Sequence, residues 1–192
     1  MKKSAINSQS GFSLMEGIVA IGIIGIMLGM AIMNFGGILP NFKANSALDQ
    51  ILYQMRSARE QAIAHRRQVQ VDFVGNNQIR ITEIWPVGTA PAPITYTFEG
   101  GAKFVTYPSV PDLPAPYNFG NTAAIYFGGL AGGPPIMRFS TDGSFVNGGN
   151  ALLNGTVFIG IPGNPTTARA ISVLGATGRV RPYHWDGKAW QE

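Results

Sequence analysis

The sequence predicts an α+β protein in which a long N-terminal transmembrane/amphipathic helix carries a small antiparallel β-rich globular head. Three observations predict this class. After Glu16 no charged residue appears until Lys43. Apolar residues then recur at helical spacing over residues 45–67. From Gln68 onward the apolar period changes to two, and Pro/Gly-rich connections separate the short runs. Because the helical segments precede the strands and do not alternate with them, the pattern favours α+β over α/β.

The apolar segment is long enough to cross a bilayer. The 24 residues from Phe12 to Phe35 would span about 36 Å as a helix, against roughly 30 Å of hydrocarbon. Lys2 and Lys3 precede the segment and predict a cytoplasmic N-terminus with the rest of the chain outside. A plain anchor or an ordinary secretory signal would explain the length. Neither explains Glu16, because a carboxylate inside a membrane is costly.

The run GFSLME at residues 11–16 resembles the class III signal of type IV pilins and type II secretion pseudopilins. The resemblance implies that a prepilin peptidase/methyltransferase cuts after Gly11 and N-methylates Phe12. Glu16 then becomes the fifth residue of the mature chain. The resemblance further implies that Glu16 pairs with the cationic N-terminal amine of a neighbouring subunit during assembly. The alternative left open is a glutamate that only reaches the lipid headgroups from the helix end.

The helical pattern after the span is amphipathic. Gly36-Gly37 and Pro40 are expected to bend or interrupt the helix. Beyond them one face is apolar and is expected to pack on a sheet, while the opposite face is polar. The apolar face consists of Leu48, Ile51, Leu52, Met55, Ala58, Ala62 and Ile63, and the polar face of Asp49, Gln50, Arg56, Arg59, Glu60 and Arg66.

The sequence pattern predicts strands in the remaining chain. Residues 68–74 and 79–82 alternate polar and apolar around a Gly-Asn-Asn turn, which predicts a hairpin. Further strands are expected at 94–98, 103–107, 123–127, 136–140, 156–161 and 168–174. The expected organisation is therefore a prepilin leader peptide over 1–11, a transmembrane and assembly helix over 12–40, and a periplasmic head over 41–192, with helix 45–67 followed by a β-rich part over 68–192.

Three later stretches are similar to the GspH/FimT family of minor pseudopilins (type II secretion system protein H-like). They are MRSAREQAI at residues 55–63, FSTDG at 139–143 and TGRVR at 177–181. The resemblance implies the pilin-like fold of that family, a long N-terminal helix with a small β-rich head. One departure is that many pilins have a proline in the middle of the span, where this chain has Met33.

The composition argues against an enzyme. There is no cysteine, which excludes a disulfide framework, a thiolate metal site and a cysteine nucleophile. His65 and His184 are far apart in sequence, and the glycine-rich stretch 128–133 lacks the Gly-Lys-Ser/Thr ending of a phosphate-binding loop. Asp142 alone cannot supply the oxygens that calcium requires. We therefore expect no catalytic residue, no cofactor and no metal.

A basic motif near the C-terminus is the main candidate for ligand binding. On an extended chain Arg179 and Arg181 point to the same side, and Lys188 follows a little later. The resemblance to the competence-associated FimT branch implies possible DNA contacts at these three residues. The favoured interpretation is structural: the arginines are edge-strand charges or lie at the rim of an interface. Loss of Lys2 and Lys3 with the leader lowers the formal charge from +4 to +2, a weak excess for binding DNA.

The expected function is structural. The sequence predicts a minor pseudopilin of a pseudopilus tip in type II protein secretion, anchored once in the bacterial inner membrane with a cytoplasmic N-terminus and a periplasmic head. The alternative is a minor type IV pilin that binds DNA for natural transformation through Gly178–Arg181. Expected partners are other pseudopilins or pilins, the prepilin peptidase/methyltransferase, the inner-membrane assembly platform and membrane lipid, with DNA possible.

Overall fold

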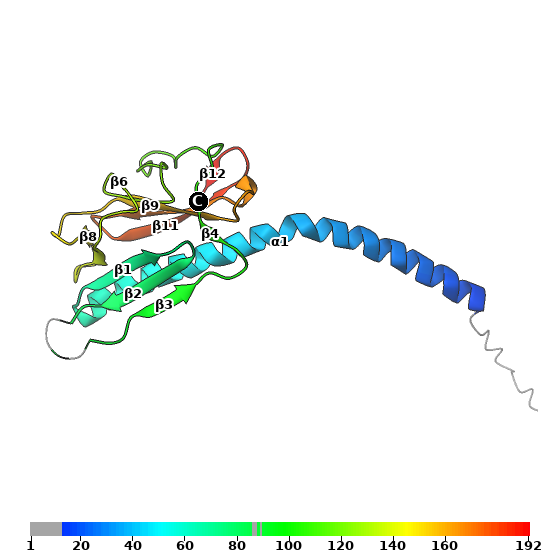
Figure 1. Cartoon of the computed structure of the whole chain (residues 1–192), viewed down its shortest axis with the longest axis horizontal. Coiled ribbons are helices and arrows are strands. Elements are labelled where there is room, and N and C mark those ends of the chain that lie inside the picture. The colour runs from blue at the N-terminus through cyan, green and yellow to red at the C-terminus, as the bar shows by residue number, and fades with distance from the viewer. Residues whose placement is uncertain (1–12, 86–87, 89) are drawn as a thin grey trace, which may run out of the picture. The chain divides into compact units, whose positions relative to one another are not determined.

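The computed structural model describes residues 13–85, 88 and 90–192 (Figure 1). The chain divides into two compact units, residues 1–39 and 40–192. One helix, α1 (Leu14–His65), begins in the first unit and ends in the second. All strands belong to the second unit. The α+β class expected from the sequence, with the helix first and antiparallel sheets after it, is confirmed.

The helix differs from expectation in one respect. Of the bend or interruption expected at Gly36–Pro40, the interruption does not occur, since α1 is helical through these residues and contains Pro40 in its interior. A proline removes a single backbone hydrogen bond, and the turns on either side keep theirs. At its C-terminus α1 ends with Arg66 in the left-handed region, at φ 53°.

The strands are short and are joined by turns. The hairpin expected at 68–82 is present as β1 and β2. Strands β6, β8 and β12 were not expected, and β11 was expected only as an extended edge at Arg179 and Arg181. The strands are β1 (Val69–Val74), β2 (Gln78–Glu83), β3 (Ile94–Thr97), β4 (Lys103–Phe104), β5 (Ile125–Phe127), β6 (Leu130–Ala131), β7 (Met137–Phe139), β8 (Phe145–Asn147), β9 (Gly155–Gly160), β10 (Arg169–Leu174), β11 (Arg179–Trp185) and β12 (Trp190–Gln191).

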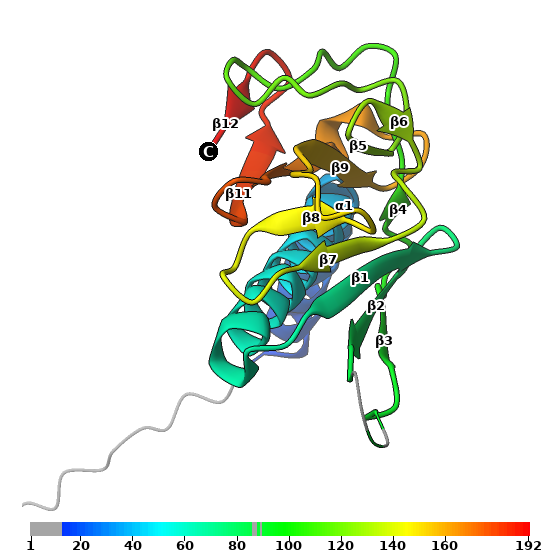
Figure 2. The same cartoon turned by 90° about the vertical axis from the view of Figure 1, so that its left-hand side faces the viewer.

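In the part of the chain that the structure describes, these strands form two antiparallel sheets. The first has the order β3-β2-β1-β7-β8, and the second has the order β12-β11-β10-β9-β5-β6 with β4 also paired to β9. In Figure 2 the cyan part of α1 lies beside β1 and β7. The sheets and the second half of α1 therefore enclose a common interior.

That interior is built from the apolar face of the helix and the inner faces of both sheets. Leu48, Ile51 and Met55 of α1 are fully buried and belong to one cluster with Val71 of β1 and Ile171 of β10. The expected packing of the helix stripe on a sheet is thus confirmed for these residues. Ile63, expected in the same stripe, is 41% exposed. It lies in the last turn of the helix, where its side chain faces Gly143 in the β7–β8 turn.

The opposite face of the second sheet has a smaller core. Phe158, Ala170 and Tyr183 are buried there with Leu113, and Tyr117 packs against them. The segment between β4 and β5 supplies the two covering residues. The sheet is therefore buried on both faces along part of its length.

A buried arginine ties the start of the second unit's helix to β10. The Arg169 side chain is almost completely buried, and in the described structure it is paired with no carboxylate. Its Nε donates to Asn45 Oδ1 at 2.6 Å, and one Nη donates to Asn41 Oδ1 at 3.1 Å. Its other Nη donates to the carbonyl oxygens of Ala168 and Thr166, at 2.8 and 3.3 Å. Neutral oxygens thus satisfy the cation, whose pKa is lowered by burial.

Strand β11 is at the edge of its sheet for most of its length. On that side β12 pairs only with His184 and Trp185. Within the unpaired part, Pro182 has no backbone N–H to donate. The carbonyl oxygen of Val180 accepts a hydrogen bond from Arg56 of α1 at 3.4 Å. The edge is therefore covered by a helix side chain at one position and lacks a donor at another.

Candidate functional site

The N-terminal signal falls partly outside the described residues. The expected cleavage site, Gly11 and Phe12, lies outside them, as does the leader. Glu16 is in the first turn of α1 and is exposed. The large apolar side chains that the structure describes between residues 14 and 30 are also exposed, Leu14 to 82%. Such a surface is typical of a segment that is covered by other molecules.

Within the described residues, none of the helices combines the length and the apolar character needed to cross a membrane.

The C-terminal TGRVR motif contributes its first two residues to the turn between β10 and β11 and its last three to the start of β11. Gly178 has φ +58°, in the left-handed region. A β-carbon added there would overlap the carbonyl oxygen of Gly143, in the turn between β7 and β8. Only glycine allows this close approach of two backbones. The close packing of the two turns therefore explains why the motif contains a glycine, without a bound ligand.

The three stretches that carry the GspH/FimT resemblance meet at this point. Arg59, in residues 55–63, donates from its Nε to the carbonyl oxygen of Thr177 at 3.0 Å and to that of Gly143 at 3.2 Å. One side chain thus joins the helix to the β10–β11 turn and to the β7–β8 turn. In the latter turn, Asp142 accepts from the hydroxyl and the backbone N–H of Ser144, which lowers the pKa of Asp142.

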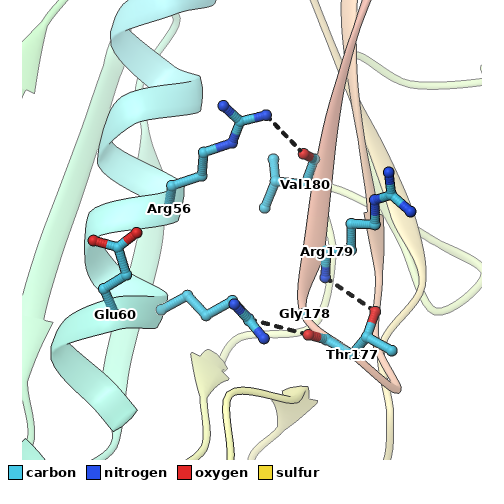
Figure 3. A pocket seen from close by; sticks show the side chains of 7 residues that line it. Arg56, Glu60, Thr177, Gly178, Arg179 and Val180 are labelled. Carbon is cyan, nitrogen blue, oxygen red and sulfur yellow. Dashed lines mark hydrogen bonds between the residues drawn. The ribbon is translucent and has the colours of Figure 1, made fainter. Parts of the chain in front are cut away.

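An open cavity of about 450 Å³ lies between α1 and the β10–β11 turn (Figure 3). Its lining residues are Arg56, Arg59, Glu60, Thr177, Gly178, Arg179 and Val180. In Figure 3 Arg56 points from the helix toward Val180, whereas the guanidinium of Arg179 points away from the helix. The polar groups that reach across the cavity are therefore helix arginines bound to backbone carbonyls.

The three residues expected to contact DNA are not brought together as one site. Arg179 is exposed, and in the described structure its guanidinium has no hydrogen-bond or ion-pair partner. Arg181 donates to Glu192 Oε2 at 2.6 Å and lies over the Tyr117 ring, 4.8 Å from its centroid. Lys188 lies beyond the other end of β11, in the turn to β12. The seven residues of β11 separate Lys188 from Arg179 by roughly 20 Å.

Sequence reasoning placed Arg56 and Arg59 on the polar face of the helix and assigned them no partner. Their acceptors are backbone carbonyls far away in sequence, which no residue pattern displays. Among the described residues, no three His, Asp or Glu side chains are grouped as metal ligands would be. His184 lies close to Arg169, and burial, followed by that guanidinium, lowers the pKa of His184.

Comparison with known proteins gives one match to a family model. Residues 6–32 match the prokaryotic N-terminal methylation motif. The chain thus carries an N-terminal methylation motif that runs into the long helix α1, and antiparallel sheets follow that helix.

Two solved structures are similar to it. One is the type IV minor pilin FimU of Pseudomonas aeruginosa, with 15% identity over 71% of this chain and 85% of that chain and a TM-score of 0.44. The other is the minor pseudopilin EpsH from the type 2 secretion system of Vibrio cholerae, with 11% identity over 73% of this chain and 95% of that chain and a TM-score of 0.46. Structural similarities at these identities and TM-scores do not indicate a function. No curated protein sequence matches the chain.

Proposed function

We propose that the chain is a minor pseudopilin, a structural subunit at the tip of a pseudopilus that serves type II protein secretion. The methylation motif at residues 6–32 is the observation that carries this proposal. The subunit is cleaved after Gly11, methylated on Phe12 and anchored in the bacterial inner membrane with its N-terminus in the cytoplasm. It then assembles with other pseudopilins through its N-terminal helix.

Mass spectrometry of the native protein tests the processing step. The expected mass is that of a chain beginning at Phe12 with one added methyl group. An intact start methionine, or cleavage beyond the apolar segment, would refute the proposal. The protein for this measurement is isolated from the membrane fraction of cells that express the full chain together with its prepilin peptidase.

Glu16 carries the assembly step in this proposal. The Glu16→Ala variant is expected to be processed normally but to enter filaments poorly, because the N-terminal amine of the neighbouring subunit loses its counter-charge. The matched control is Glu99→Ala, which removes one exposed carboxylate from the head. Sedimentation of sheared filaments gives the incorporated fraction. Equal incorporation of Glu16→Ala and wild type would remove Glu16 from the assembly mechanism.

The DNA-uptake alternative has weaker support from the geometry. Arg181 already neutralises Glu192, and Lys188 lies far from Arg179 along β11. A DNA backbone needs several cations within reach of successive phosphates. A gel-shift experiment at low salt with the wild type and the Arg179→Ala/Arg181→Ala variant decides the question. Salt-sensitive binding that the double substitution abolishes would replace secretion with DNA uptake as the proposed function.

A further inference from the structure

Strand β3 (Ile94–Thr97) lies at one margin of the first sheet. It pairs with β2 on one side, and in the described part of the chain no strand pairs with it on the other. In Figure 2 it is the outermost strand of that sheet. Its four residues, ITYT, are uncharged, and each is β-branched or aromatic, the types that favour strands. The strand therefore lacks the charges and the interior proline that protect most edge strands.

The other sheet margins within the described residues are covered, interrupted or short. On β8, the carbonyl oxygen of Phe145 accepts from Leu153, and the N–H of Asn147 donates to Ala151. Strand β11 contains Pro182, and β6 and β12 have two residues each. Among the described strands, β3 is thus the one whose margin is both open and uninterrupted.

The backbone groups of β3 point in alternate directions. Phe98, the residue after the strand, donates to the carbonyl oxygen of Asn77 at 2.8 Å. Hydrogen-bonded positions alternate in an antiparallel pair, so the residues two and four positions before Phe98 also bond to β2. The N–H and C=O groups of Thr95 and Thr97 therefore point away from the sheet. The described structure gives them no hydrogen-bond partner, so they offer two donors and two acceptors to an incoming chain.

The inner face of β3 extends an apolar row out of the interior. Val71 of β1 is opposite Ile81 of β2, and Ile81 is opposite Ile94. The exposed fraction rises along this row from 0% through 7% to 56%. The adjacent row ends at Tyr96, which is half-buried and packs against the main core. An apolar side chain of an added strand would lie beside Ile94 and remove it from water.

The outer face of β3 carries hydroxyl groups. Thr95 is opposite Arg80, which is opposite Asp72. Arg80 already pairs with Asp72, at 3.1 Å between Nη2 and Oδ2. The amide of Gln78 donates to the hydroxyl of Thr97 at 3.1 Å. This face therefore presents polar groups to an incoming strand and no unpaired charge.

We propose that β3 binds an extended segment of another protein by strand addition. The free backbone groups select an extended chain, because only a strand presents donors and acceptors at the matching spacing. The two faces select its side chains: apolar residues at alternate positions beside Ile94, and uncharged polar residues between them beside Thr95. Pro93 precedes the strand and lacks an N–H, so the contact spans roughly four residues of the partner. The inference concerns the folded head and does not depend on the proposed function.

A synthetic peptide of this pattern, KTVTVTK with a fluorescent label, tests the binding. Fluorescence anisotropy with the purified full chain in detergent gives the affinity. The matched control peptide carries N-methyl groups on two adjacent central residues, which removes one donor from each of its edges. We expect the control peptide to bind about tenfold more weakly, as for the loss of two hydrogen bonds. Equal affinity of the two peptides would overturn the proposal.

The Thr95→Pro variant tests the margin of the protein itself. It removes an N–H that points to solvent and keeps the β2–β3 bonds, which is the arrangement in which an edge strand tolerates proline. Affinity for the unmodified peptide is expected to fall about five- to tenfold, because a donor is lost and the ring obstructs the partner. The matched control, Thr95→Val, keeps the N–H and is expected to retain wild-type affinity. Equal affinity of the two variants would contradict strand addition.

Amide hydrogen exchange of the wild type, followed by NMR, locates the contact without any substitution. With the peptide bound, the amides of Thr95 and Thr97 are expected to exchange several-fold more slowly, whereas those of Ile94 and Tyr96 already bond to β2 and change little. Protection of neither threonine would refute the proposal. Protection of both that appears without peptide and increases with protein concentration would also refute it, because the occupant would then be a second copy of this chain.

Discussion

The Gly178→Ala substitution tests whether the glycine of the C-terminal motif is needed for the close approach of the β10–β11 and β7–β8 turns. The new β-carbon would overlap the Gly143 carbonyl oxygen, so the two turns must separate. Alanine at φ +58° also costs about 1–2 kcal/mol in the left-handed region. Separation of the turns weakens the two bonds of Arg59 Nε, and a hydrogen bond from a charged group is worth about 1.5–3 kcal/mol. We expect a loss of about 2–4 kcal/mol in the free energy of unfolding.

Urea unfolding of residues 40–192, followed by tryptophan fluorescence, measures this loss. The matched control is Gly163→Ala, at φ +80° but with no atom within 4 Å of the added carbon. That control isolates the backbone cost of about 1–2 kcal/mol. Equal losses in the two variants would refute the close approach of the turns. A loss below about 0.5 kcal/mol for Gly178→Ala would refute the strained conformation as well, since it lies within the range of neutral surface substitutions.

Three further predictions concern the interior of the head. Asn45→Ala removes the acceptor of Arg169 Nε and should lower the free energy of unfolding by about 1.5–3 kcal/mol; a change below about 0.5 kcal/mol in urea unfolding would contradict the role of that bond. Because the pKa of His184 is lowered in the folded state, the unfolded chain takes up the proton first, so stability should be complete above pH of about 6.5 and fall as the pH drops below it. His184→Gln should flatten this dependence between about pH 7 and 5.5. The buried hydroxyl of Thr156 has no hydrogen-bond partner in the described structure, so Thr156→Val should leave the thermal midpoint unchanged or raise it, and a clear drop would show that the hydroxyl is satisfied.

The sequence predicted the elements whose periodicity is long and regular. Leu48, Ile51 and Met55 repeat at helical spacing and are buried, and the alternation on either side of Gly75 marks the β1–β2 hairpin. The sequence placed Arg179 and Arg181 on an extended edge but did not predict the whole of β11, whose sequence RVRPYHW contains a proline that argues against a central strand. The structure accommodates Pro182 because that part of β11 has no neighbour on one side. Of the two outcomes expected at Pro40, a bend or an interruption, the interruption does not occur, because a proline removes one backbone hydrogen bond and the turns on either side keep theirs.

The candidate site was predictable only in part. The motif around Arg179 and Arg181 was visible in the sequence, but the partners of Arg181 were not. Glu192 and Tyr117 approach it only because β12 folds back and because the segment between β4 and β5 covers the sheet. The acceptors of Arg59 are main-chain oxygens, which every residue type possesses. Contacts of this kind depend on tertiary structure and leave no local sequence pattern.

The exposed margin of β11 has a consequence for subunits that are crowded together. An added strand needs a row of free donors and acceptors along the margin it joins. Here Pro182 interrupts the donors, and Arg56 already occupies the oxygen of Val180. In the proposed assembly, neighbouring heads are therefore not expected to join into a continuous sheet at this margin.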